Sequence, residues 1–364
     1  MVVVVDGYSV QSQQVSPTVS AKNSSSQKQH YVPEVLLSLY AEGSGKGRLY
    51  VFDKHAGQSL PGPMTVKKLC KEGGFYTAEA PHGKVSLEES FQLLEDEYRR
   101  IAGKVIQARS LSNLTTREFG ALIGFVCVQF LRVPRMRKAF EQMGQLIADK
   151  ADSVRPQASS HGDFETLLNE NELRLRHLEV IAHGAVEGTR ILARYAWFML
   201  EADADHPLWL SDCPVVMHND EKSIYAGLGF AAPGVQIYFP ITPKLLLACW
   251  HPLVAGRFIE KRQADKSLLG QLKAQYILGL RNNKAALKAE MDKLEKEAKP
   301  VADLVAAMRS RGTAAATADN VLHFNWLQFQ WSYRFILCST GNFALASKML
   351  KEHPELKTGM MVTG

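Results

Sequence analysis

The stretch from residue 195 to residue 250 constrains the fold of this chain more than any other part of the sequence. It holds three apolar runs, WLSDCPVVMHND, GVQIYFPIT and KLLLACW, which are bounded by turn residues such as Gly, Pro, Asn and Asp. Short runs rich in β-branched and aromatic residues are typical of strands, and short links between them favour antiparallel neighbours. We therefore expect a central, mainly antiparallel sheet. Its expected strands cover residues 48–54, 209–218, 234–241 and 244–250.

Helical patterns dominate the rest of the chain. A series of apolar residues recurs at alternating steps of four and three, which places the series on one stripe of a helix. These residues are Leu87, Phe91, Leu94, Tyr98, Ile101 and Val105. Thr115 and Glu118 fit the capping box that starts a second helix. Such helices need a sheet, or each other, to bury their apolar stripes, so we predict an α+β fold in which many helices surround the sheet. The expected helical regions cover residues 86–148, 163–196 and 256–310.

Composition and local bias predict how the chain is divided. With 46% hydrophobic and 22% charged residues the chain can bury a full core, which excludes a disordered protein. Residues 1–28 are rich in Ser, Gln, Thr and Val without periodicity, and we expect a flexible arm there. Residues 29–345 are expected to form a single α+β domain, and residues 346–364 a C-terminal tail.

Charge and cysteine usage bear on partners and compartment. The formal net charge of +6 permits contact with nucleic acid without requiring it, because acidic residues are interleaved with the basic ones. The 5 cysteines lie far apart and mostly within apolar runs, so we expect free, buried thiols in a reducing cytoplasm. Neither CxxC nor HExxH occurs, so the common zinc signatures are absent. No apolar run approaches the roughly 20 residues that span a bilayer. We therefore expect a cytoplasmic protein without a membrane partner.

The most apolar helix of the sequence carries a charge near its end. Residues 121–131 are apolar nearly all round, which predicts a buried helix. Gln129 nevertheless lies within this helix, Arg132 directly follows it, and Pro134 then ends or kinks it. An unpaired buried charge is strongly destabilising. We therefore expect Arg132 to have a partner, either a structural one or a ligand. Gln129 is expected to contact a substrate bound at the same place.

Three further residues are candidates for catalysis. His30 has a side-chain pKa near neutrality, which suits a general acid or base, although a histidine that only anchors the N-terminal segment is the plainer interpretation. Ser211 and Asp212 stand where a loop becomes a strand, and there Ser and Asp commonly cap a turn. The sharper hypothesis places His30, Asp212 and Arg132 in one cleft. In that cleft Asp212 orients the imidazole as general base, Arg132 stabilises an anionic oxygen, and Ser211 is a nucleophile or a substrate contact.

A divalent cation is part of the same hypothesis. Glu95 and Asp212 are expected as ligands of Mg or Mn, which take oxygen ligands and promote chemistry on phosphates. The alternative for Glu95 is a surface ion pair with Arg99, four residues further along the same helix. Lys244, which lies between two expected strands, is a second candidate for substrate binding.

Six segments in a fixed order give the chain a family resemblance. They are QHYVP, LYVFDK, GFY, QFLRVPRMR, LSDCPVV and FPITPKLLL, which begin at residues 29, 49, 74, 129, 210 and 239. Taken together, they resemble the mostly bacterial family of the domain of unknown function 4238. The resemblance supports the fold and the choice of site residues, and it implies no particular activity.

Two functions are therefore expected from the sequence. The first is a hydrolase, for example a nuclease, that acts on nucleic acid or a nucleotide, in a bacterial toxin or defence context. The second is a non-catalytic binding or regulatory module that engages a protein partner through the long helices expected over residues 256–310.

Overall fold

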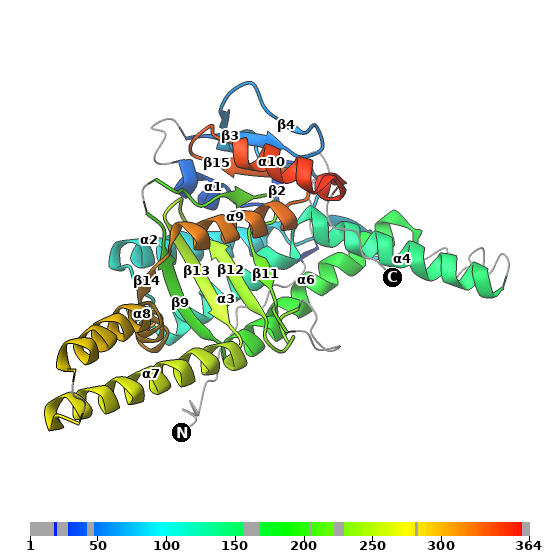
Figure 1. The fold of residues 1–364 in the computed structure, drawn as a ribbon. Helices are drawn as coiled ribbons and strands as arrows, with labels where there is room; N and C mark the ends of the chain where they lie inside the picture. The colour runs from blue at the N-terminus through cyan, green and yellow to red at the C-terminus, as the bar shows by residue number, and fades with distance from the viewer. Residues whose placement is uncertain are drawn as a thin grey trace.

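The computed structural model of the chain describes residues 18–19, 28–41, 47–155, 168–203, 205–221, 229–280 and 283–358. These residues form an α+β fold with two five-stranded sheets and helices packed around them (Figure 1). The arm expected over residues 1–28 lies outside the described residues, apart from the short strand β1 (Thr18–Val19) and the first residue of β2 (Lys28–His30).

The first sheet contains the two strands expected over residues 234–241 and 244–250. Its order is β11-β12-β13-β9-β14, and all its pairs are antiparallel except β14 with β9. Every residue of β12 and β13 is buried, which explains why both read as continuous apolar runs. The bounds are β9 (Ala196–Glu201), β11 (Val216–His218), β12 (Gln236–Pro240), β13 (Leu245–Trp250) and β14 (Thr313–Ala315).

The second sheet corrects the expectation of a single one. Its order is β10-β15-β3-β4, with β5 also paired to β3, and it lies above the first sheet in Figure 1. The expected strand at residues 209–218 is divided between the two sheets, because Pro214 has no N–H for a ladder and the chain turns there. The bounds are β3 (Arg48–Asp53), β4 (Gln58–Ser59), β5 (Met64–Thr65), β10 (Leu210–Ser211) and β15 (Phe335–Cys338).

The remaining short strands form two small sheets, β1-β8-β7 and β2-β6. β2 pairs antiparallel with β6 (Lys71–Gly73), and β7 (Thr77–Ala80) pairs with β8 (Gly83–Ser86). Helix α1 (Glu34–Ala41) follows β2, and the 3-10 helix η3 (Val66–Lys68) precedes β6. Helix α9 (Ala318–Trp331) lies between the two sheets (Figure 1). Its Gln328 and Trp331 donate hydrogen bonds to the carbonyls of Pro214 and Met217, at 2.9 and 2.8 Å.

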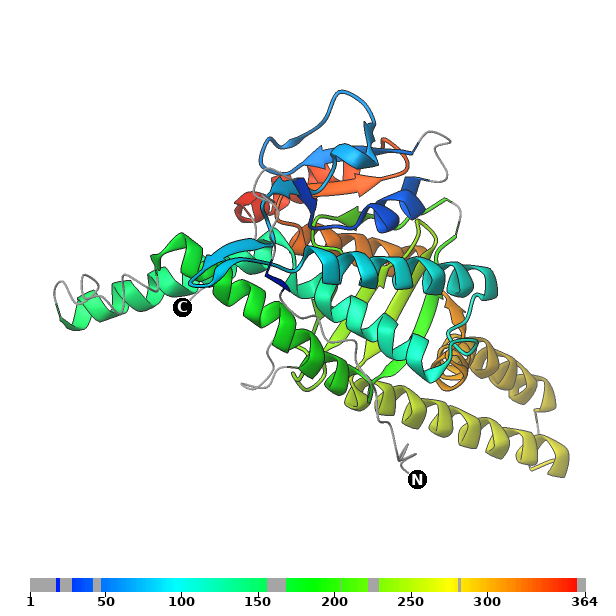
Figure 2. The same ribbon diagram turned by 180° about the vertical axis from the view of Figure 1, so that it is seen from behind.

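Helices α2 (Glu88–Ala108) and α3 (Thr116–Leu131) cover the rear face of the first sheet (Figure 2). The apolar stripe expected between Leu87 and Val105 is buried, as predicted. The capping box of Thr115 and Glu118 is confirmed by both of its hydrogen bonds. Helix α4 (Pro134–Val154) begins at Pro134 and bends by 51° from α3, while α6 (Glu170–Leu192) packs against both. Within the described residues no single helix is long and apolar enough to cross a membrane, although α3 and α4 together have that length and composition.

A helical hairpin extends away from the body of the molecule. It consists of α7 (Pro252–Leu278) and α8 (Lys284–Ser310), and both views show its tip far from the sheets (Figures 1 and 2). The segment expected as a tail from residue 346 contains most of α10 (Ala344–Glu352) and the 3-10 helix η5 (Pro354–Thr358). Ala346 and Met349 of α10 are buried in a small apolar cluster with Phe52 and Phe343.

Candidate functional site

A polar pocket opens beside the N-terminal end of the described domain. It has a volume of about 450 Å³ and lies between β2, helix α1, Tyr76 and helix α2. The sequence of α2 explains its polarity, because Glu88, Gln92, Glu95 and Arg99 follow one another at helical spacing beside the buried apolar stripe. The polar side chains that line the pocket are His30, Glu34, Ser38, Tyr76, Glu88, Gln92, Glu95, Asp96 and Arg99.

His30 is the one imidazole in the lining of this pocket. It stands at the end of β2, opposite Lys71 of β6, and its side chain is half-buried. The Nε2 atom is buried without a hydrogen-bond partner in the described part of the chain. Burial lowers the pKa of His30 below 6.5, and this effect outweighs the opposing influence of the Glu34 and Glu95 carboxylates. The imidazole is therefore neutral at pH 7, the form in which it accepts a proton.

Arg132 is fully buried directly behind the pocket, and its expected partner is Glu95. Its Nη1 donates to Glu95 Oε1 at 2.8 Å, and its Nε donates to Gln129 Oε1 at 2.9 Å. The guanidinium also lies 5.1 Å from the centre of the Phe91 ring. Its Nη2 has no hydrogen-bond partner among the described residues. Glu95 thus pairs with Arg132 across two helices, and the expected surface pair with Arg99 is wrong.

Hydrogen bonds join Arg132 to the segment that carries His30. Gln129 Nε2 donates to the carbonyl of Tyr31 at 3.0 Å. The Tyr76 hydroxyl lies 3.1 Å from the Arg132 carbonyl and 3.3 Å from the His30 carbonyl. Gln129 is buried and does not line the pocket, so it holds the framework of the site in place.

Carboxylates give the pocket its charge. Glu34, Glu88, Glu95 and Asp96 line it together with a single cationic side chain, Arg99. Burial raises the pKa of Glu88, and the Glu95 carboxylate raises it further. The two carboxylates therefore repel each other, and a cation bound between them would relieve that repulsion.

Asp212 does not belong to this pocket, which corrects the expected cleft. The side chain is fully buried, and its Oδ1 accepts from the N–H of Tyr333 at 2.8 Å. Its Oδ2 accepts from the N–H groups of Arg334 and Phe335, at 2.7 and 2.9 Å. Burial nevertheless raises the pKa of Asp212, because desolvation outweighs these three hydrogen bonds. Asp212 anchors the turn between α9 and β15, so its backbone partners are distant in the chain and do not belong to the local turn that the capping interpretation expected.

Ser211 and Lys244 also lie elsewhere. Ser211 Oγ is buried, lies 2.7 Å from Gln328 Oε1 and accepts from the N–H of Cys213 at 3.2 Å, so the expected nucleophile is a turn residue. Lys244 lies exposed in the turn before β13, beside a separate hollow that Glu201 and Asp203 also line. Lys244 therefore does not line the pocket of His30.

The expected metal pair of Glu95 and Asp212 is wrong for the same reason. One Glu95 oxygen accepts from Arg132, and both Asp212 oxygens accept from backbone N–H groups. In the part of the chain that the structure describes, no group of three or more His, Cys, Asp or Glu side chains is arranged to hold a metal ion. All five cysteines are buried and free, as predicted.

Of the polar side chains that line the pocket, the sequence interpretation placed only His30 and Glu95 among the site residues. Glu88 was available from the helical spacing of Glu88, Gln92, Glu95 and Arg99, which marks a polar face next to the stripe. Tyr76 carries no such signal, because it reaches the site through the turn between β6 and β7. What the structure brings together is His30, Glu95 and Arg132, supported by Gln129.

The fold and the pocket define an α+β protein with a histidine and several carboxylates in one polar cavity. The chain belongs to the DUF4238 family of proteins of unknown function, whose sequence profile matches residues 28–342. That range includes every residue of the pocket. No curated protein and no solved structure matches the chain.

Proposed function

We propose that this protein is a hydrolase that acts on a phosphate-containing substrate, a nucleic acid or a nucleotide, in the pocket of His30 and Glu95. The observation that carries the proposal is the His30 Nε2 atom, which belongs to a residue of the pocket lining, is buried and lacks a partner within the described residues. Leaving a buried donor or acceptor unpaired costs about 1–3 kcal/mol, so such atoms at a pocket favour a ligand that supplies the missing partners. The buried free thiols support a cytoplasmic location, and the toxin or defence context is part of the same proposal.

His30 has the properties of a general base in this proposal. Its lowered pKa keeps the imidazole neutral at pH 7, so it takes a proton from an attacking water or hydroxyl. The carbonyls of His30 and Arg132 both lie within reach of the Tyr76 hydroxyl, which holds the backbone of His30 close to that of Arg132. Arg132 holds Glu95 in position and contributes a fixed positive charge behind the pocket.

The carboxylates determine how a phosphate could enter. A bare phosphate would be repelled by Glu34, Glu88, Glu95 and Asp96, so the proposal includes Mg²⁺ or Mn²⁺. Mg²⁺ is usually bound by one or two carboxylates together with waters and the phosphates of the substrate. A pre-formed cluster of three protein ligands is therefore not required, and Glu88 with Glu95 supplies the protein's share.

Turnover assays test this function directly. Purified protein is incubated with RNA, DNA and nucleotides, with and without Mg²⁺ or Mn²⁺, beside His30→Gln and the matched control His82→Gln, an exposed histidine outside the pocket. Removing a general base lowers the rate by roughly 10²- to 10⁴-fold, so His30→Gln should lose turnover and His82→Gln should retain it. Equal turnover in both variants would remove His30 from the chemistry. If the unaltered protein turned over none of these substrates, the hydrolase proposal would fail.

The alternative function, binding of a protein partner, is favoured by one observation on the hairpin of α7 and α8. Ile277, Leu278 and Leu280 at its tip are exposed by 79%, 68% and 68%. Helix α7 also carries more basic than acidic residues, which favours a partner with acidic groups around an apolar patch. A photo-crosslinking residue at position 278, compared with one at the exposed Lys293 of α8, tests it in cells. Crosslinks that are equally abundant at both positions would argue against a specific partner at the tip.

A further inference from the structure

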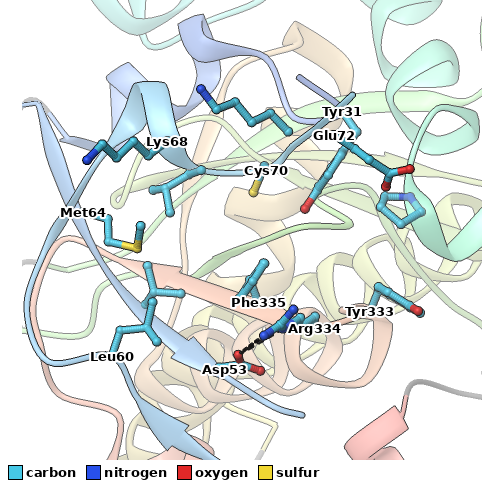
Figure 3. Close-up of a pocket in the computed structure, with 14 residues that line it drawn as sticks. Tyr31, Asp53, Leu60, Met64, Lys68, Cys70, Glu72, Tyr333, Arg334 and Phe335 are labelled. Carbon is cyan, nitrogen blue, oxygen red and sulfur yellow. Dashed lines mark hydrogen bonds and ion pairs between the residues drawn. The ribbon is translucent and has the colours of Figure 1, made fainter. Parts of the chain in front are cut away.

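A second pocket lies beside Tyr31, the residue that follows His30. It has a volume of about 430 Å³ and is lined by residues of η3, β6, β3 and β15 and by Pro134 (Figure 3). That volume falls within the roughly 300–1,000 Å³ typical of small-molecule sites. Most of the lining is apolar, and Leu60 and Met64 close one side in Figure 3. The aliphatic and aromatic hydrocarbon side chains of the lining are Val51, Leu60, Met64, Leu69, Pro134 and Phe335.

The carboxylates of this pocket are already paired with guanidinium groups. Asp53 Oδ2 accepts from Arg334 Nη2 at 2.7 Å and from Arg334 Nε at 3.0 Å. Glu72 Oε1 accepts from Arg137 Nη2 at 2.9 Å. Because each carboxylate in the lining has its own guanidinium, neither an anion nor a cation would meet an uncompensated opposite charge at these two ion pairs.

The two lysines that also line the pocket do not change this balance. Figure 3 shows the Lys68 side chain extending away from the cavity. Lys71 is opposite His30 in the antiparallel pairing of β2 with β6, and residues opposite each other in such a pair project to the same side. The Lys71 ammonium group therefore belongs to the surroundings of His30. Among the described residues, the second pocket thus presents no uncompensated charge to a ligand.

Tyr31 and Cys70 give the cavity a neutral polar point. Figure 3 shows both side chains pointing into the pocket, toward Phe335 and Arg334, and the Tyr31 hydroxyl and the Cys70 thiol are hydrogen-bonded to each other. The N–H of Tyr31 also donates to the carbonyl of Cys70 at 2.9 Å, which fixes the two residues together. Cys70 has a φ of 50°, in the left-handed region that residues other than glycine seldom adopt, and strained backbone of this kind is concentrated at binding and catalytic sites.

We propose that this second pocket binds a neutral, mainly apolar small molecule with one hydroxyl group. The apolar body lies against Leu60, Met64 and Phe335, and the hydroxyl group meets the Tyr31 hydroxyl. Leu60 and Met64 are partly exposed to solvent, so the ligand removes apolar surface from water. A charged molecule is disfavoured because it would lose its hydration without gaining a counter-charge. This site is separate from the pocket of His30 and does not depend on the proposed hydrolase function.

Calorimetric titration with matched eight-carbon probes tests the proposal. Octanol carries the hydroxyl group, while octanoate and octylamine carry an anionic and a cationic group on a chain of the same length. Octanol should bind at a single site on each chain. The two charged probes should bind at least about ten-fold more weakly, because the loss of their hydration is not compensated. Absence of octanol binding, or equal binding of either charged probe, would overturn the proposal.

Variants assign the binding to this pocket. Tyr31→Phe removes only the hydroxyl and should weaken octanol binding about five-fold, the effect of one lost hydrogen bond. Leu60→Asp introduces a carboxylate into the apolar lining and should abolish binding, while Leu93→Asp, at an exposed position on α2 outside the pocket, should not. Lys68→Ala/Lys71→Ala should bind octanol as the unaltered protein does, because neither ammonium group faces the cavity. Unchanged affinity in either Tyr31→Phe or Leu60→Asp would refute the assigned site.

Discussion

The lysine buried beneath the second sheet leads to a quantitative prediction about pH. Lys54 is fully buried, and its Nζ donates to the carbonyls of Phe329 and Ser332, both at 2.9 Å. Desolvation lowers the pKa of Lys54 to about 8, against the attraction of the Asp212 carboxylate, which raises it. Because the ordinary lysine pKa is 10.5, the unfolded chain binds this proton more tightly than the folded protein does.

The direction and size of the effect follow from this difference. A group that binds its proton more tightly in the unfolded state destabilises the fold at low pH, and the loss is recovered as pH rises through the two pKa values. Integration from roughly pH 7.5 to 10 gives a gain of about 2 kcal/mol in the free energy of unfolding from this residue alone. Lys54→Met lacks the titrating group and should lack the gain.

Urea unfolding followed by circular dichroism measures this pH-dependent gain in the free energy of unfolding. The free energy of unfolding of Lys54→Met is subtracted from that of the unaltered protein at each pH, so titrations common to both cancel. Lys293→Met, at an exposed position on α8, is the matched control and should give a flat difference. If the difference for Lys54→Met were equally flat between pH 7.5 and 10, the buried lysine would have an ordinary pKa and the reasoning would be refuted.

Three further predictions concern the imidazole of His30, the ion pair of Glu95 with Arg132, and the buried carboxylate of Asp212. If the protein is a hydrolase, its rate should increase with pH through a pKa below 6.5, because the His30 base must be deprotonated, and this limb should be absent from any residual rate of His30→Gln. Glu95→Gln should lower the free energy of unfolding by about 3 kcal/mol, since Arg132 is left buried without a counter-charge, whereas Asp96→Asn should have little effect in the same urea measurement. Asp212→Leu should lower it by at least about 3 kcal/mol, because three buried N–H groups lose their acceptor. The exposed Asp220→Asn is its control, and equal midpoints for the two variants would contradict the anchoring role.

Local patterns in the sequence predicted the elements whose cause is local. The stripe along α2 and the capping box of Thr115 were predicted because periodicity and capping act within a few residues. The division into two sheets was not predicted from the sequence, because it depends on how residues 212–215 cross from one sheet to the other. In the aromatic stretch at residues 320–340, helix α9 ends at Trp331 and strand β15 begins at Phe335. Asp212 fixes that change of direction from a position more than a hundred residues earlier.

The difference between local signals and long-range packing also explains which site residues were predicted correctly. The need of Arg132 for a partner was predicted from the apolar helix around it, because a buried charge requires compensation wherever it lies. That Glu95 is this partner depends on how α2 packs beside α3. Asp212 and His30 looked equally available for catalysis in the sequence, and only the fold separates a buried turn anchor from a pocket residue.

His30 and Tyr31 are adjacent in the chain, yet each lines a different cavity. The backbone that joins these two residues therefore borders both cavities. A ligand in one cavity that displaced this backbone would alter the other cavity, and binding at the two places would then be thermodynamically linked. Whatever factor one occupant imposes on the affinity for the second, the second must impose on the affinity for the first.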